Sequence, residues 1–167
     1  NTQYNKKSWS FNITSKRIIS WLSNHQLTYE DSDKEYKIKF DHSIQKQANH
    51  VLNEIVNSSE FENKMIGCAA IILTGLAYRD DKNYLNSGLN ILKKIIKSSF
   101  DNHGFPKSRS VKQLCFYLKY FIIIREWFKE SQNTIPEYID ETIYYLGQSY
   151  AFISVSYTHL TLPTKWI

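Results

Sequence analysis

The chain has 167 residues, of which 42% are hydrophobic and 15% aromatic, and this apolar content excludes an intrinsically disordered chain. Its longest apolar run, residues 115–124, is interrupted by Lys119 and is shorter than the roughly 20 residues that cross a membrane, so we expect a soluble globular protein with no membrane partner. The net charge is +5, but the lysines are scattered along the chain, which predicts solvated helix faces and no nucleic-acid partner, although an acidic polymer would use the same charge.

The first third of the chain contains two predicted helices. Residues 12–25 predict a short amphipathic helix with one apolar face made of Ile18, Ile19 and Leu22. Residues 28–40 are charged and weakly patterned, so we interpret them as a loop. A second helix is predicted over residues 41–56, where Asp41 can cap the first turn and apolar residues recur at helical spacing: Ile44, Ala48, Val51, Leu52 and Ile55.

A central helix is predicted over residues 59–78. Ser59 and Glu62 have the spacing of a capping box, in which each side chain satisfies a free backbone amide of the first turn. The rest of the segment is nearly all apolar or small. Each glycine costs about 1 kcal/mol of helix propensity relative to alanine. The small residues therefore indicate close approach of another helix; they are Gly67, Ala69, Ala70 and Gly75.

Three further helices are predicted over residues 81–99, 109–128 and 134–152. The second of these is apolar nearly all round, which predicts burial on several sides, with one face made of Val111, Leu114, Cys115, Leu118, Phe121, Ile122 and Arg125. The third begins with a second capping box and a proline in the first turn: Thr134, Pro136 and Glu137. Both cysteines lie in apolar helical patterns and predict buried free thiols: Cys68 and Cys115. The short intervals between helices favour an all-α fold of stacked antiparallel helix pairs.

The last segment differs in composition from everything before it. Its sequence, VSYTHLTLPTKWI, resembles translated library adapter that recurs at the ends of unrelated open reading frames. We therefore expect a native helical domain over residues 1–154, a non-native tail over residues 155–167, and a natural protein that continues past residue 154.

Motifs of high specificity are absent from the sequence. It contains no phosphate loop, no GxGxxG, no HExxH and no GxSxG. The cysteines lack CxxC spacing and the histidines are too spread for a metal cluster; they include His25, His42, His50 and His103. We predict no metal and no cofactor.

The segment DNHGFPKSRS, residues 101–110, interrupts the helical pattern. Gly104 and Pro106 break the helix, and Ser108 or Ser110 can cap the next one, so the segment can be a plain connector. Alternatively it is a site, because binding residues are often mounted on loops of a rigid helical array. Lys107 and Arg109 could then hold an anionic group.

The order of these features resembles the N-terminal α-helical domain of heparinase II/III-like proteins, in particular a bacterial branch of unassigned substrate. The resemblance covers residues 9–153 and is carried by SWSFNITSKRIISWL, ILTGLAYRD, DNHGFPKSRSVKQLCFYLKYFIIIREWF and IPEYIDETIYYLGQSYAF. In that family the loop often reads Asp-Gly-Gly-His, a variable pair, then Arg-Ser-Pro. The resemblance implies an incomplete (α/α) toroid of antiparallel helix hairpins, normally followed by a β-sandwich domain that is missing here. It leaves the compartment open between periplasm and cytoplasm.

The resemblance also implies polysaccharide lyase chemistry on a uronic-acid-containing polysaccharide. In active members an Asn and a Tyr of the helical domain and a His of the sheet domain neutralise the uronic carboxylate and remove the C5 proton, so that β-elimination breaks the glycosidic bond. The Asn position falls near Glu62 and Asn63, and the Tyr position falls near Gln113. We therefore assign no catalytic residue. The loop motif itself is matched by Asp101, His103 and Arg109, with Lys107 as a local addition.

We expect the intact protein to be a heparinase II/III-like polysaccharide lyase, with this chain as most of its helical domain and inactive alone. An acidic polysaccharide or oligosaccharide would be its partner, contacted by His103, Lys107 and Arg109. Two alternatives stay open: a non-catalytic helical module that binds an anionic glycan or a protein through the basic loop, and a helical scaffold that binds protein on its concave face.

Overall fold

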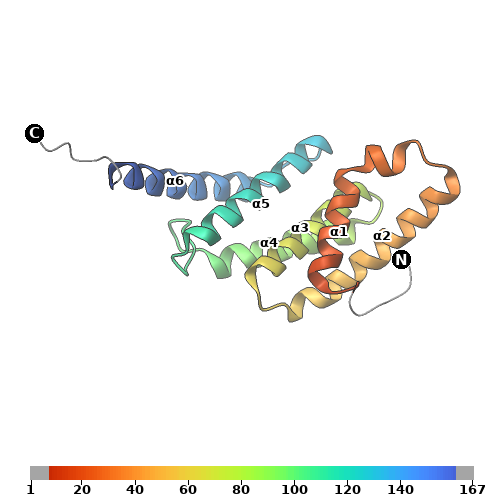
Figure 1. Ribbon diagram of the computed structural model, residues 1–167, viewed down its shortest axis with the longest axis horizontal. Helices are drawn as coiled ribbons and strands as arrows, with labels where there is room; N and C mark the ends of the chain where they lie inside the picture. The colour runs from red at the N-terminus through yellow and green to blue at the C-terminus, as the bar shows by residue number, and fades with distance from the viewer. Residues whose placement is uncertain (1–7, 161–167) are drawn as a thin grey trace, which may run out of the picture.

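The computed structural model describes the backbone of residues 8–160, with side chains except those of residues 28, 82 and 156–160. Within this range the chain is all-α, as predicted (Figure 1). The helices are α1 (Phe11–Ser23), α2 (Lys34–Glu54), α3 (Phe61–Ala77), α4 (Lys82–Ser99), α5 (Val111–Glu130) and α6 (Glu137–Leu160), with a π-helical turn η1 (Gln26–Glu30) and a 3₁₀ turn η2 (Ile55–Asn57). None of the helices in the described range is long and apolar enough to cross a membrane.

Helix α3 forms the centre of the fold, as its composition predicts. It packs against α1, α2, α4 and α5, and every residue from Met65 to Leu76 is buried. The small residues permit this close packing: Gly67 faces the Phe11 ring of α1, and Gly75 faces the backbone of Leu85 in α4. A methyl group at either position would collide with its neighbour, which explains why glycine is used inside a helix despite its low propensity.

Helices α3 and α4 form an antiparallel hairpin. The end of α3 at Gly75 contacts the start of α4 at Leu85, and Gly88, one turn further along α4, contacts Ile71 and Ile72, one turn earlier in α3. The Asp81 side chain caps α4 by accepting a hydrogen bond from the amide of Asn83 (3.0 Å). This pairing agrees with the expected succession of helix pairs.

The predicted loop over residues 28–40 is wrong. Helix α2 begins at Lys34, because the Asp33 carboxylate accepts a hydrogen bond from the backbone amide of Tyr36 (2.7 Å) and caps the first turn. Phe40 then supplies the first buried side chain of this helix. Asp41 lies inside the helix and is not its cap, and its carboxylate is free to act elsewhere.

The two predicted capping boxes do not form. Helix α3 begins at Phe61 after Glu60, which makes no side-chain cap bond, and Glu62 instead lies 2.9 Å from Lys112 of α5. Helix α6 begins at Glu137, two residues later than a cap at Thr134 requires. At both starts the helix begins one or two residues after the position that the predicted cap requires.

The buried face of helix α5 only partly matches the predicted one, with Leu114 and Phe121 in common. Val111 and Ile122 are exposed, and so is Cys115, which corrects the prediction of two buried thiols; Cys68 is buried as predicted. The face that points inward consists of Leu114, Tyr117, Phe121, Ile124, Trp127 and Phe128. It meets α3 on one side and α6 on the other.

Helix α6 packs against α5 at one end of the molecule, whereas α2 lies at the other end (Figure 1). Arg125 of α5 and Asp140 of α6 form an ion pair (2.8 Å), and Ile139, Thr142 and Leu146 are buried. The helix continues without a break past residue 154 to Leu160. The rest of the predicted tail, residues 161–167, lies outside the described residues.

Candidate anion-binding groove

The loop between α4 and α5 is a short, closed hairpin. The Lys107 amide donates to the carbonyl of Ser99 (2.9 Å), and the Asp101 amide donates to the carbonyl of Phe105 (2.9 Å). Phe100 and Pro106 lie opposite each other between these bonds. Ser110 then caps α5 by accepting a hydrogen bond from the backbone amide of Gln113 (3.3 Å). Of the two predicted caps, Ser108 and Ser110, the structure uses Ser110. The loop is therefore held in one shape.

Asp101 organises the interior of this loop. One carboxylate oxygen accepts from the amides of His103 and Phe105 (2.9 Å each), and the other lies 2.7 Å from Nη1 of Arg109. The hydrogen bond from Phe105 is the largest influence and lowers the pKa of Asp101 from its ordinary value. The bond from His103 and the charge of Arg109 lower it further, and desolvation opposes them. Asp101 is consequently a loop anchor at neutral pH.

Arg109 adopts a backbone conformation that is uncommon for its residue type. Its φ is +58°, a left-handed conformation that costs roughly 1–2 kcal/mol in a residue with a Cβ. Its guanidinium lies over the ring of Phe105 (5.5 Å to the centroid) and pairs with Asp101, yet 69% of the side chain stays exposed. The remaining guanidinium N–H groups are thus presented to solvent at a fixed position.

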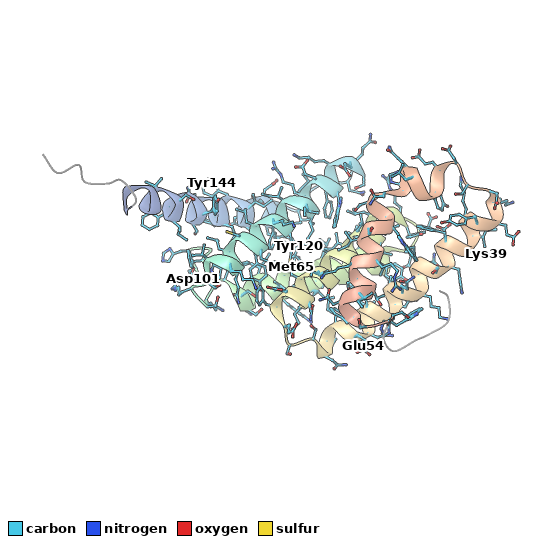
Figure 2. All side chains as sticks on the ribbon, viewed as in Figure 1. Lys39, Glu54, Met65, Asp101, Tyr120 and Tyr144 are labelled. Atoms are coloured by element: carbon cyan, nitrogen blue, oxygen red, sulfur yellow. The ribbon has the colours of Figure 1, made fainter. Side chains whose placement is uncertain are left out.

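The loop and helix α6 enclose an open groove of about 650 Å³. Gly104, with φ of +73°, packs directly on Tyr145 of α6, so the tip of the loop is seated on the helix. Figure 2 shows Asp101 and Tyr144 at the same end of the molecule. The groove is lined by Ile96, Lys97, Phe100, Asp101, Asn102, His103, Gly104, Lys107, Arg109, Tyr138, Glu141, Thr142 and Tyr145.

The structure brings His103, Lys107 and Arg109 together in this groove. The ammonium of Lys107 already makes one hydrogen bond, because its Nζ donates to the carbonyl of Lys97 (3.0 Å) at the end of α4. The pair His42 and His50 makes no common site, because His42 is exposed and His50 is bonded through Nε2 to the carbonyl of Trp9 (2.8 Å). Among the described residues no three potential metal ligands lie together.

Residues of α4 and α6 were missing from the predicted site. Tyr138, Glu141 and Tyr145 recur at spacings of three and four, which places them on one face of α6. The spacing shows that they share a face, but only the seating of Gly104 on Tyr145 shows that this face meets the loop. Lys97 enters the groove from the last turn of α4.

The groove combines positive charge with aromatic surface. Three permanent cations, Lys97, Lys107 and Arg109, face two carboxylates, Asp101 and Glu141, which leaves a net charge of +1 with His103 neutral. Because Asp101 is saturated by the loop, the exposed charge is mostly cationic. Such a surface can bind an anionic group through charge-assisted hydrogen bonds.

Tyr138, one of the two tyrosines that line the groove, keeps its hydroxyl protonated at neutral pH. Burial raises the pKa of Tyr138 to about 12, with a smaller contribution from nearby Cys68. Its buried hydroxyl has no hydrogen-bond partner among the described residues, and its ring carries the ammonium of Lys93 at 5.1 Å. Tyr138 therefore supplies a ring and a protonated hydroxyl.

Gln113, near which the family resemblance places its tyrosine, and Tyr117, one helical turn later, have structural roles here. Gln113 accepts from the Ser108 hydroxyl through Oε1 (2.6 Å) at the start of α5. Tyr117 is 1% exposed, and its hydroxyl donates to Oγ of Ser99 (3.0 Å). Burial also raises the pKa of Tyr117.

Comparisons of the chain with protein-family models, curated proteins and solved structures find no match.

Proposed function

We propose that the groove between residues 100–110 and helix α6 binds a segment of an acidic oligosaccharide, as the substrate contact of a heparinase II/III-like polysaccharide lyase. The observation that carries the proposal is the meeting of His103, Lys107 and Arg109 in one groove with the ring of Tyr145. The α-helical hairpins would form part of the (α/α) toroid that the family resemblance implies.

The chemistry of the lining suits a uronic acid. Its carboxylate can pair with the exposed guanidinium of Arg109, and an adjacent carboxylate or sulfate can pair with the ammonium of Lys107. Sugar rings present apolar C–H faces, which pack on aromatic rings such as that of Tyr145, 40% exposed at the groove. In β-elimination the C5 proton leaves to a base, the C4–O bond breaks and a C4–C5 double bond forms. The groove would hold the substrate for this step.

Binding of uronic-acid oligosaccharides to the purified chain tests the proposal. Isothermal titration at low salt should show saturable binding of an acidic hexasaccharide and none of a neutral one. Lys107→Ala and Arg109→Ala should each weaken binding about fivefold, the equivalent of ~1 kcal/mol for a partly exposed ion pair. Lys39→Ala is the matched control, because it removes one lysine at the opposite end of the molecule (Figure 2). Unchanged affinity in both loop variants would exclude the loop as the binding site.

A non-catalytic glycan-binding module is the second candidate. It is favoured by the hydrogen bond between the Gln113 side chain and Ser108 and by the burial of Tyr117, both in the region where the family places its tyrosine. Both candidates predict that this chain alone releases no unsaturated uronide from acidic polysaccharides, measured by ultraviolet absorbance, because the resemblance places the family's histidine in a separate sheet domain. Release by the purified chain would contradict both. Uronide release by the protein joined to a strand-rich C-terminal domain would select the lyase.

A further inference from the structure

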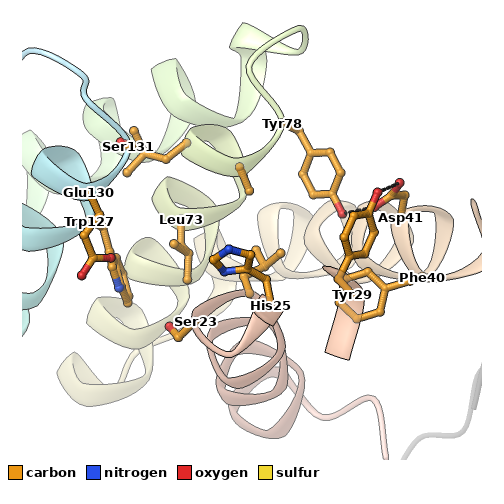
Figure 3. A pocket seen from close by; sticks show the side chains of 13 residues that line it. Ser23, His25, Tyr29, Phe40, Asp41, Leu73, Tyr78, Trp127, Glu130 and Ser131 are labelled. Atoms are coloured by element: carbon orange, nitrogen blue, oxygen red, sulfur yellow. Dashed lines mark hydrogen bonds between the residues drawn. The ribbon is translucent and has the colours of Figure 1, made fainter. Parts of the chain in front are cut away.

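A second cavity, of about 370 Å³, lies on the side of the molecule where three helices end. It is lined by residues from the last turns of α1, α3 and α5, together with His25, Tyr29 of η1 and two residues of α2 (Figure 3). It shares no lining residue with the groove beside residues 100–110. Its polar groups take no part in the glycan binding proposed for that groove.

Asp41 is the fixed anionic group of this cavity. Its Oδ2 accepts from the hydroxyl of Tyr29 (3.0 Å) and its Oδ1 accepts from the hydroxyl of Tyr78 (2.8 Å), as Figure 3 shows. Burial and the bond to Asp41 raise the pKa of both tyrosines, so both hydroxyls remain donors. Two tyrosine donors use about two of the roughly four acceptor positions of a carboxylate. Asp41 is thus held rigidly and can accept further hydrogen bonds.

The ends of the three helices add negative potential to the cavity. The C-terminal end of an α-helix carries about half a negative charge, on backbone carbonyls that lack intrahelical partners. Leu22 and Ser23 end α1, Leu76 and Ala77 end α3, and Glu130 ends α5. Glu130 contributes a full carboxylate across the cavity from Asp41 (Figure 3).

The cations near this cavity are held outside it. Arg79 donates to the carbonyl of Ser131 just past the end of α5, and Lys37 donates to the carbonyl of Glu30 (2.9 Å). Neither side chain lines the cavity. His25 lines it and lies 3.3 Å from Glu30, so it faces a carboxylate of its own. The carbonyls around the rim therefore already attract positive groups. The lining itself includes two carboxylates, the half-buried Asp41 and the exposed Glu130, and no lysine or arginine.

Aromatic side chains form much of the wall. The aromatic residues that line the cavity are Tyr29, Phe40, Tyr78 and Trp127. The ring of Phe40 contacts the ring of Tyr29 edge-on (5.5 Å between ring centroids) and the ring of Trp21 at a tilt (5.8 Å between ring centroids). Aromatic faces attract cations through their quadrupole, and the attraction is strongest where water is excluded. Leu73 and Leu76 complete an apolar floor. A cavity of this size accommodates one small molecule.

We propose that this cavity binds a small organic cation, an ammonium group on a compact apolar body. The ammonium donates to the Asp41 carboxylate between Tyr29 and Tyr78, and the body packs on apolar and aromatic side chains that line the cavity. A neutral or anionic molecule of the same shape would meet two carboxylates and three helix C-termini without the charge to match them. The proposal is independent of glycan binding at the groove.

Three probes with one shape and different charge test it: benzylamine, benzyl alcohol and benzoate. Binding is followed by ¹H–¹⁵N NMR, with the amide of Tyr78 and the indole N–H of Trp127 as reporters. Benzylamine should saturate and shift both signals. Benzyl alcohol should bind at least about tenfold more weakly, because a charge-assisted hydrogen bond contributes roughly 1.5–3 kcal/mol. Benzoate should not bind. Equal affinity for the amine and the alcohol, or no saturation by the amine, would overturn the proposal.

Two isosteric variants locate the ammonium. Asp41→Asn should weaken benzylamine about tenfold through loss of a charged acceptor, and Glu130→Gln should weaken it less. Glu54→Gln, an exposed position that does not line the cavity, is the matched control and should bind as the parent does. Glu130 is exposed, so its variant remains folded and informative even if Asp41→Asn unfolds. If Asp41→Asn folds and binds benzylamine as the parent does, the assignment of the ammonium to Asp41 is refuted. It is also refuted if Glu130→Gln binds benzylamine as the parent does and benzyl alcohol binds as tightly as benzylamine.

Discussion

Arg109 and Asp101 form an ion pair (2.7 Å) across the base of the loop that joins α4 to α5, and Asp101 at the same time accepts the amides of His103 and Phe105. The residue with the most favourable chemistry for an anionic ligand is therefore also part of the loop's own framework. An anionic ligand would share Arg109 with Asp101.

Asp101→Asn should loosen the loop while leaving the helices intact. The variant keeps one carbonyl acceptor but loses the second oxygen and the charge that pairs with Arg109. Hydrogen exchange at the amides of His103 and Phe105 should accelerate severalfold, whereas amides in the middle of α3 should exchange as in the parent. Unchanged exchange at His103 would show that the backbone bonds of the loop hold it without Asp101.

Acid should release the same loop. The pKa of Asp101 is lowered in the folded state from its ordinary value of 3.8, so its stabilising contribution is fully present above about that pH. The contribution is lost as the pH falls from the ordinary value through the lowered folded value. The chemical shifts of the His103 and Phe105 amides should titrate together below pH 4, and the transition should be absent in Asp101→Asn. A transition centred above the ordinary value would contradict the arrangement.

Gly104→Ala should destabilise the protein by about 1–2 kcal/mol, because a left-handed φ is strained in alanine. The new methyl group would also press on Tyr145. Gly104→Asn separates the two effects, since asparagine tolerates the left-handed conformation but still brings a Cβ to Tyr145. Urea unfolding should show a loss in both variants. A parent-like Asn variant would mean that the loop tip moves away from α6 at little cost.

The same substitution should have opposite effects at two helical glycines. Gly75→Ala should cost about 1–3 kcal/mol, because the methyl group meets the backbone of Leu85 and overpacks the α3–α4 contact. Gly147→Ala has open space and should gain up to about 1 kcal/mol from helix propensity. Equilibrium unfolding in urea measures both. A loss at Gly147 of similar size would show that the α3–α4 contact is not what distinguishes Gly75.

The positions where sequence reasoning succeeded are those where one physical signal dominates. The segment from Met65 to Leu76 is apolar on every face, so it can only be central, and its glycines imply neighbours at close range. Gly104 and Pro106 lie in the loop that follows the end of α4 at Ser99, and Ser110 caps α5. For α3 the residue types leave one structural solution, and for the cap of α5 they leave two, of which Ser110 is used.

The failures arise where tertiary contacts choose among local solutions. Helix α2 begins at Lys34, although Tyr36 and Ile38 are exposed and only Phe40 gives its first turns an apolar anchor. Helix α5 is apolar all round, so its inward face is set by where α3 and α6 lie and not by its own periodicity. Asp41 was expected to cap a helix; its partners Tyr29 and Tyr78 lie 12 and 37 residues away, and no local pattern relates them.

The burial of α3 on all sides makes the two ends of the chain depend on each other. Helix α3 is covered by α1 and α2, which precede it in the chain, and by α4 and α5, which follow it. A chain divided in the loop at residues 100–110 would leave one side of α3 in water and α5 without its contact with α3. Each piece should be unstable alone, yet the two should reassemble when mixed, so the loop is a natural place to split the protein into complementing fragments.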